Sequence, residues 1–216
     1  MKKIFSIGVL LLTILSVTAR EYSDSAIYQG INLKLDLLTP IMEVARSKGS
    51  LQSYELALNC RLKQRFFPTL EMGYAFGETG TNTCQYTGHG GFARVGLDLN
   101  GLKKHPESPN ALLVGVRFAG AYQNYNLIGV SMNDTYWQRT PTRDFLHQKQ
   151  FDCWGEVVGG CQVQIAGGFT MGWYIRLKVL MTRNAKPDSV LPYYIPGFGY
   201  RDDTNWGLNY YLGWKF

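Results

Sequence analysis

The feature that most constrains the fold is an alternation of apolar and polar residues that recurs along the chain. Successive side chains of a β-strand point to opposite faces of the sheet, so a two-residue period is typical of strands with one apolar face. The last such segment runs from Trp206 to Phe216, and every second residue in it is large and apolar. Seven earlier segments show the same period, at 30–38, 54–62, 70–77, 93–99, 112–122, 151–165 and 170–180. The sequence therefore predicts an all-β protein of eight strands.

The connections between the predicted strands alternate in length. Long connections lie at 39–50, 78–90, 123–150 and 181–203, and shorter ones at 63–66, 100–110 and 166–168. Outer-membrane barrels show this alternation, because their periplasmic turns are short and their extracellular loops are long. An even number of strands joined in this way predicts a closed antiparallel up-and-down barrel that crosses a membrane.

The residues between the large apolar ones indicate which face of the strands is inside. A soluble barrel would carry many long charged side chains on its outer face, whereas an eight-stranded barrel has an interior just wide enough for its own side chains. We therefore expect the apolar side to face lipid and the polar side to face a packed lumen. Many residues on the polar side are small: Gly73, Ala75, Gly96, Gly115, Ala119, Ala121, Gly172, Gly207 and Gly213.

The charged residues on the polar side carry both signs. Buried charges are costly unless they are paired, and Arg can hold a carboxylate through two parallel hydrogen bonds. The sequence thus predicts an ion-pair network in the lumen, with solvated charges on a soluble sandwich as the alternative. The predicted network consists of Glu55, Arg61, Glu71, Arg94, Asp98, Arg117, Glu156 and Arg176.

The beginning of the chain has the pattern of an export signal. A basic start, Met1 to Lys3, precedes an apolar run over 4–17, and small residues, Val17 and Ala19, stand where signal peptidase prefers them. This pattern predicts a secretory signal peptide over 1–19 and one barrel domain over 20–216, rather than a retained membrane anchor.

The signal peptide, the eight alternating strands and the aromatic last strand resemble the small outer-membrane β-barrels of Gram-negative bacteria, of the OmpA and OmpX type. The resemblance covers the mature chain and implies a place in the cell outer membrane, among lipid and lipopolysaccharide. The last strand resembles the signal read by the barrel-assembly machinery, with Tyr210, Trp214 and Phe216 as its elements, although Tyr211 stands where Gly is common. The family expected is an uncharacterised one, so the resemblance implies no inherited activity.

Charge and cysteine content exclude other classes of function. The formal net charge of +6 falls to +4 without Lys2 and Lys3, and the basic residues form no cluster, so nucleic-acid binding is not indicated. The four cysteines match no metal motif, and no cofactor is expected. A disulfide between Cys84 and Cys153 is one reading, and small apolar residues on a buried or lipid-facing side are the other.

Two functional readings remain open. The loops at 133–140 and 192–203 are rich in Tyr, Trp, Arg and Pro, a composition that suits a binding rim. We therefore expect a non-catalytic membrane anchor, or a binding or accessory subunit, whose long extracellular loops contact an envelope protein partner. The alternative is a barrel enzyme acting on lipid or peptide, with His147 as a general base near Ser131, Asp144 and Asp152. A diffusion pore is disfavoured because side chains fill a lumen of this size.

Removal of Phe216 is expected to impair assembly, because the terminal aromatic residue is part of the predicted insertion signal. Surface labelling of cells that express the truncated chain measures this. Normal surface levels of a chain without Phe216 would contradict the assignment.

Overall fold

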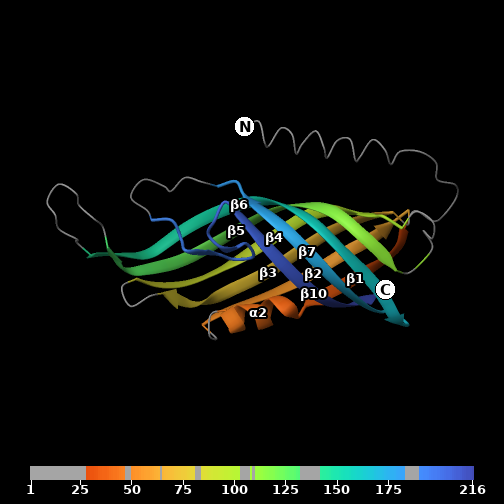
Figure 1. The fold of residues 1–216 in the computed structure, drawn as a ribbon, viewed down its shortest axis with the longest axis horizontal. Helices are drawn as coiled ribbons and strands as arrows, with labels where there is room; N and C mark the ends of the chain where they lie inside the picture. Colours follow the sequence, from red (N-terminus) through yellow and green to blue (C-terminus); the bar gives the residue numbers. More distant parts are fainter. Residues whose placement is uncertain are drawn as a thin grey trace.

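Eight long strands form one antiparallel sheet that closes on itself as a barrel (Figure 1). Each strand pairs with its neighbours in sequence, and the first and last strands pair to close the ring. The all-β prediction of eight antiparallel strands is therefore confirmed. The strands are β1 (Tyr28–Asp36), β2 (Leu51–Leu62), β3 (Phe66–Gly80), β4 (Gln85–Asn100), β5 (Ala111–Ser131), β6 (Thr142–Ala166), β7 (Phe169–Leu180) and β10 (Thr204–Lys215).

The computed structural model describes residues 28–46, 50–63, 65–80, 84–102, 108, 110–131, 142–182 and 190–216. The predicted signal peptide at 1–19 and the loop at 133–140 lie outside these residues. The barrel has two distinct ends. We call the end with the turn at 167–168, where Phe216 and the connection between β2 and β3 also lie, the turn end, and the opposite end the loop end.

The side chains alternate between the two faces of the wall as the two-residue period predicts. On β2, Leu56 and Leu58 are 47% and 40% exposed, whereas Ala57 and Asn59 between them are 3% and 2% exposed. The same pattern repeats around the ring, so most large apolar residues of the strands point outward, whereas the charged residues and most small residues point inward. An ordinary water-soluble barrel has the reverse arrangement, because burial of apolar surface drives its folding.

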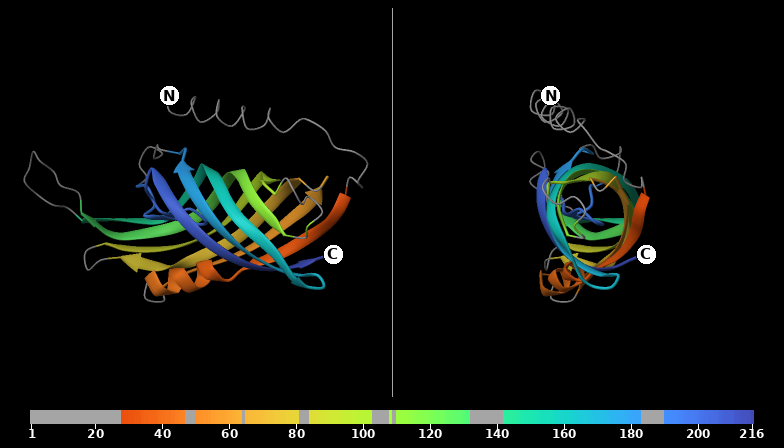
Figure 2. Two further views of the ribbon diagram at one scale, coloured as in Figure 1. Left: turned by 45° about the vertical axis from the view of Figure 1, so that its right-hand side comes forward. Right: turned by 90° about the vertical axis from the view of Figure 1, so that its right-hand side faces the viewer.

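Two connections predicted as loops are mostly strand, and those predictions were wrong. The predicted loops at 78–90 and 123–150 are largely occupied by the ends of β3, β4, β5 and β6, and the β5–β6 ribbon reaches furthest at the loop end (Figure 2). Inward aromatic residues support this extension: the rings of Tyr86 and Tyr125 stack at a centroid distance of 6.0 Å. The apolar alternation fades over these residues because several outward positions are polar, which is why the sequence pattern missed them.

The predicted loop at 39–50 contains an unpredicted helix, α2 (Leu38–Arg46). Asp36, at the end of β1, starts this helix, because its Oδ1 accepts a hydrogen bond from the Leu38 N–H at 3.1 Å. Pro40 lies in the first turn, where its missing N–H costs nothing. Within the described ranges, no helix has both the length and the apolar character needed to cross a membrane.

The connection before β10 folds back as a small hairpin of β8 (Tyr194–Ile195) and β9 (Gly199–Tyr200). Tyr194, Ile195 and Phe198 are buried, at 4%, 0% and 1% exposure. Gly197 and Gly199 have φ angles of +75° and +111°, which side chains other than glycine rarely adopt. Seen along the barrel, this segment lies within the ring (Figure 2, right). We call residues 194–200 the plug hairpin.

A Gly115→Val substitution is expected to lower the free energy of unfolding by about 1–3 kcal/mol, the usual cost of overpacking. A β-carbon on Gly115 would lie 1.9 Å from Asp98 Oδ1 and 2.6 Å from the Leu97 carbonyl oxygen. Gly159→Val is the matched control, since a β-carbon there meets nothing within 4 Å. Denaturant titration followed by tryptophan fluorescence measures both variants, and equal midpoints would contradict the tight strand contact.

Candidate functional site

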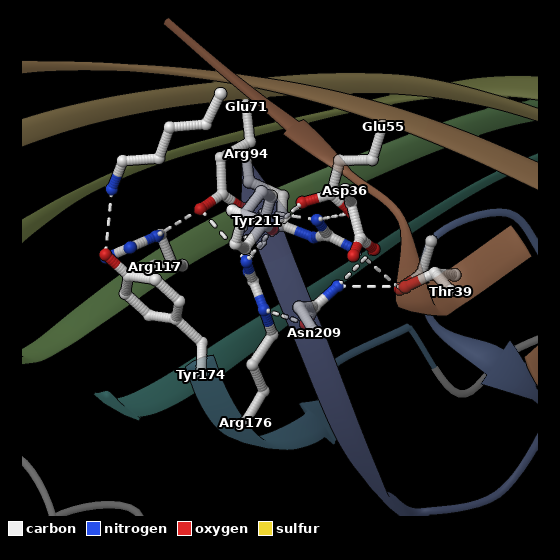
Figure 3. A network of polar contacts seen from close by, with 12 residues as sticks. Asp36, Thr39, Glu55, Glu71, Arg94, Arg117, Tyr174, Arg176, Asn209 and Tyr211 are labelled. Carbon is white, nitrogen blue, oxygen red and sulfur yellow. Dashed lines mark hydrogen bonds and ion pairs between the residues drawn. The ribbon is translucent and has the colours of Figure 1, made fainter. Parts of the chain in front are cut away.

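Three arginines and four carboxylates meet in the middle of the lumen. Figure 3 shows the three arginines with Glu55 and Glu71. They come from six different strands, β2 to β7, and every one of these side chains is at most 2% exposed. The structure thus brings together seven of the eight residues predicted as a lumen network. We call Glu55, Glu71, Arg94, Asp98, Arg117, Glu156 and Arg176 the lumen network.

Arg94 and Arg176 share the same three glutamates. Arg94 lies 2.6 Å from Glu55 and 3.0 Å from Glu156, and Arg176 lies 2.6 Å from Glu71 and 3.0 Å from Glu156. Longer contacts of 3.1 Å from Arg94 to Glu71 and 3.4 Å from Arg176 to Glu55 complete the set. Each of the three glutamates therefore contacts both of these guanidinium groups, and the arrangement ties strands on opposite sides of the barrel together.

Arg117 joins the network from the side of the turn end. Its Nε lies 3.2 Å from Glu71, while its two terminal nitrogens both donate to Asp98, Nη2 at 2.9 Å. This is the two-pronged geometry that makes Arg–carboxylate pairs strong. Asp98 also accepts a hydrogen bond from the Thr69 hydroxyl at 3.4 Å.

Arg61 is the one residue of the predicted network that does not lie with the other seven. It stands six residues beyond Glu55 on β2, roughly 20 Å at about 3.3 Å per residue, near the turn end. There its Nη2 donates to the Ser108 carbonyl at 2.8 Å, and its guanidinium lies 5.6 Å from the centre of the Phe67 ring. The two-residue alternation correctly predicts that Arg61 lies on the inner face. It does not predict at which height along the barrel axis the side chain lies.

Three neutral residues also bond to the lumen network. They were not part of the predicted network, which consisted of charged residues only. Tyr211 Oη lies 2.5 Å from both Arg176 and Glu55, and Arg176 Nε donates to Asn209 Oδ1 at 2.6 Å. Trp154 Nε1 donates to Glu156 at 2.6 Å. These residues share the inward parity of the charged ones, so the same two-residue period could have identified them.

The buried charges of the described lumen cancel. Six basic and six acidic side chains are buried, so the formal sum is zero. Such cancellation is required where water is excluded, because an uncompensated buried charge costs several kcal/mol. The basic ones are Lys34, Arg61, Arg94, Arg117, Arg176 and Lys178, and the acidic ones are Asp36, Glu55, Glu71, Asp98, Asp152 and Glu156.

Apolar layers close the lumen on both sides of the lumen network. On β6 the inward residues Trp154, Glu156 and Val158 follow one another, and each belongs to a different layer. The cluster toward the turn end contains Ala57, Phe67, Ala111, Leu113, Val158, Tyr174 and Tyr211. The cluster toward the loop end contains Phe92, Ala119, Ala121, Trp154, Leu180, Ile195 and Phe198. Charged and apolar layers together fill the interior.

The plug hairpin is bonded directly to the charged layer. The Gly197 carbonyl accepts hydrogen bonds from Arg94 at 2.8 Å and from Lys178 at 2.7 Å, and Lys178 also donates to the Phe198 carbonyl at 3.1 Å. Tyr194 donates to Glu43 of α2 at 3.4 Å. Burial, together with the Glu43 carboxylate, raises the pKa of Tyr194 well above its ordinary value, so this hydroxyl stays protonated.

The residues of the predicted assembly signal lie on the outer side of β10. Trp214 and Phe216 are 51% and 74% exposed. Tyr210 lies against Trp173, with ring centroids 4.4 Å apart. The Phe216 N–H donates to the Ile31 carbonyl at 2.8 Å, so the last residue takes part in closing the ring.

The alternative catalytic arrangement around His147 is not assembled. His147 is exposed and its N–H is held by Asn126 at 2.7 Å, whereas Asp152 is fully buried on the inner face and pairs with Arg201 at 3.0 Å. Asp144 accepts from the Gly129 N–H at 2.8 Å. In the part of the chain that the structure describes, no group of three or more His, Cys, Asp or Glu could hold a metal ion.

All four cysteines are free thiols, so the structure contains no disulfide between Cys84 and Cys153. Cys84 leads into β4 and Cys153 lies on β6, with β5 between them. Two strand spacings amount to roughly 10 Å, which exceeds the reach of a disulfide.

One protein-family model matches almost the whole chain. It is described as a domain of unknown function, DUF6048, and the match covers residues 1–214. No curated protein matches the chain at a significant level.

Replacing Arg176 by Met is expected to lower the free energy of unfolding by about 3–5 kcal/mol, because it leaves buried carboxylates without their cation. The matched control is Arg143→Met, since Arg143 is exposed on β6 and should change stability by less than about 0.5 kcal/mol. Denaturant titration compares the two variants. If both variants lost a similar amount of unfolding free energy, the lumen network would contribute no more to stability than an exposed arginine.

Proposed function

The chain belongs to the DUF6048 family, and we propose that it is an integral β-barrel protein of the cell outer membrane. In this proposal the protein is non-catalytic and acts as a membrane anchor, or as a binding or accessory subunit, through its loop end. The observation that carries the proposal is the inverted barrel, in which large apolar side chains cover the outside and a charge-balanced network fills the inside.

The outer belt is the first support. Apolar residues that are 40–60% exposed recur on every strand of the ring. In water a belt of this extent would favour aggregation, whereas in a bilayer it faces hydrocarbon. Closure of the sheet also leaves few backbone groups without partners, as lipid demands. Members of the belt are Leu33, Leu56, Met72, Val95, Phe118, Val157, Ile175 and Leu208.

The filled lumen supports an anchor rather than a channel. The lumen network and the two apolar layers are buried in the described interior, and the plug hairpin is bonded to the lumen network from the loop end. A barrel of eight strands is expected to be packed in this way. The barrel would then act as an anchor that holds the loop end and the turn end at the two surfaces of the membrane.

The loop end offers the larger surface for a partner. The β5–β6 ribbon extends beyond the rest of the barrel there, because β4 pairs with β5 only as far as Ile128, whereas β5 pairs with β6 as far as Ser131 (Figure 2). We propose that this end faces outward, toward lipopolysaccharide and an envelope protein partner, and that the turn end faces the periplasm. The barrel-assembly machinery would insert the chain through the strand that ends at Phe216.

A charged substitution in the middle of the outer belt distinguishes a membrane barrel from a soluble one, because only in a bilayer would the charge face hydrocarbon. Ile175 lies half-way along β7 and is 56% exposed. The substitution Ile175→Lys is expected to lower the free energy of unfolding in a bilayer by about 2–4 kcal/mol. Ile165→Lys, close to the turn end and 51% exposed, should cost only about 0–1 kcal/mol at the interface. Unfolding in lipid vesicles and the recovery of each variant in the outer-membrane fraction measure the difference.

Three results would refute the proposal: fractionation of the wild-type protein as soluble, no compact fast-migrating gel band without heating, or Ile175→Lys as stable as wild type. Cross-linked pull-down from membranes then tests the accessory role. A stoichiometric partner lost on shortening the β5–β6 ribbon is the expected outcome.

A further inference from the structure

The wall of the barrel is incomplete where its first and last strands meet. β1 pairs with β10 only from Asn32 and Lys215 to Asp36 and Tyr211. On its other side, β10 pairs with β7 as far as Thr204. The part of β10 from Thr204 to Tyr210 therefore continues toward the loop end after β1 has stopped.

The backbone of β10 presents an open edge along this part. The Tyr210 carbonyl accepts a hydrogen bond from the Leu37 N–H at 2.9 Å, and the Tyr210 N–H donates to Asp36 Oδ1 at 3.2 Å. These are the last hydrogen bonds that the β10 backbone makes at the end of β1. Backbone groups of every second residue point to the same side of a strand. Trp206 and Leu208 thus direct their N–H and C=O groups into the gap, where no strand among the described residues pairs with them.

Helix α2 lies beside this gap and packs against β2 and β10. Its first turn is held there by Asn209, which donates to Asp36 at 2.7 Å and to the Thr39 hydroxyl at 2.9 Å (Figure 3). Ile41 and Met42 of the helix are 63% and 36% exposed. The helix therefore continues the apolar belt across the place where β1 is missing.

A pocket lies at this seam. Trp206, Gly207, Leu208 and Asn209 line it along β10, and Thr39, Met42 and Glu43 line it from α2. The buried side chains Glu55 and Arg94 of the lumen network also belong to its lining, so the pocket reaches from the open edge of β10 toward the charged layer. Its lining further includes Lys178, Tyr194 and Phe198.

The polar part of the pocket carries no net charge. Glu43 and Glu55 are balanced by Arg94 and Lys178. The Lys178 ammonium has three N–H donors, two of which are directed to the plug hairpin. A β-carbon on Gly207 would lie 3.0 Å from Lys178 Cε and 3.4 Å from Lys178 Nζ, so the end of the Lys178 side chain lies directly against β10 at this glycine. A ligand head with an overall charge would upset this balance, whereas a net-neutral head would not.

We propose that this seam is a lateral binding site for one amphiphile with a net-neutral polar head. The head enters the pocket and bonds to the open edge of β10 and to Lys178, and the apolar tail lies outside along Met42, Trp206 and Leu208. The site rests on the proposed membrane location, because its tail-binding half opens onto the apolar belt.

The test uses the whole folded protein in nonionic detergent micelles, titrated with dioctanoyl-phosphatidylethanolamine or dioctanoyl-phosphatidylglycerol. Native mass spectrometry counts the bound lipid. We expect one retained phosphatidylethanolamine on the wild type, and at least about ten-fold weaker retention on Gly207→Val, whose branched side chain would fill the pocket floor. Gly159→Val is the matched control and should retain lipid as the wild type does.

The outcomes separate this inference from the proposed function. A wild type that folds as a membrane barrel but retains no lipid overturns only the lateral site. Equal retention by Gly207→Val and the wild type does the same, and stronger retention of phosphatidylglycerol refutes the net-neutral class. If the wild type fractionates as a soluble protein, both the membrane location and the lateral site are refuted.

Discussion

The ion-pair network in the lumen is the interaction on which the rest of the structure depends. Carboxylates and guanidinium groups removed from water lose several kcal/mol of solvation each, and only close pairing with further hydrogen bonds offsets that loss. The lumen network meets this demand because six strands deliver its members to one level of the barrel. A shift of one strand by a single residue would turn its charge outward, so the network also specifies the register.

The positions of the neutral parts follow from that charged layer. Arg94 and Lys178 hold the plug hairpin through the Gly197 carbonyl, and Asn209 links Arg176 to the start of α2. The plug hairpin and the helix are therefore not independent additions to the barrel. They cap a polar centre that would otherwise open to solvent at the loop end and at the seam between β1 and β10.

Much of this fold could be read from the two-residue period alone. It predicts strands such as 54–62 and 170–180, and it predicts that Glu55 and Arg176 share the inner face. The period could not show that Glu55 meets Arg176 while Arg61 stays near the turn end. That distinction depends on the stagger between strands, which is set by pairing around the whole ring. The helix over Leu38–Arg46 was missed because a short helix depends on its tertiary contacts more than on its own residues.

The sequence by itself determined which residues face each side of the wall, because side-chain direction in a strand follows from local backbone geometry. It also determined that the inner charges would occur in both signs, since composition alone supplies them. Only the tertiary structure decided which charges meet and where the wall is left open. Both depend on the closure of the ring, in which β1 stops at Asp36 while β10 continues. Contacts between residues more than a hundred positions apart decide such features, and no local pattern encodes them.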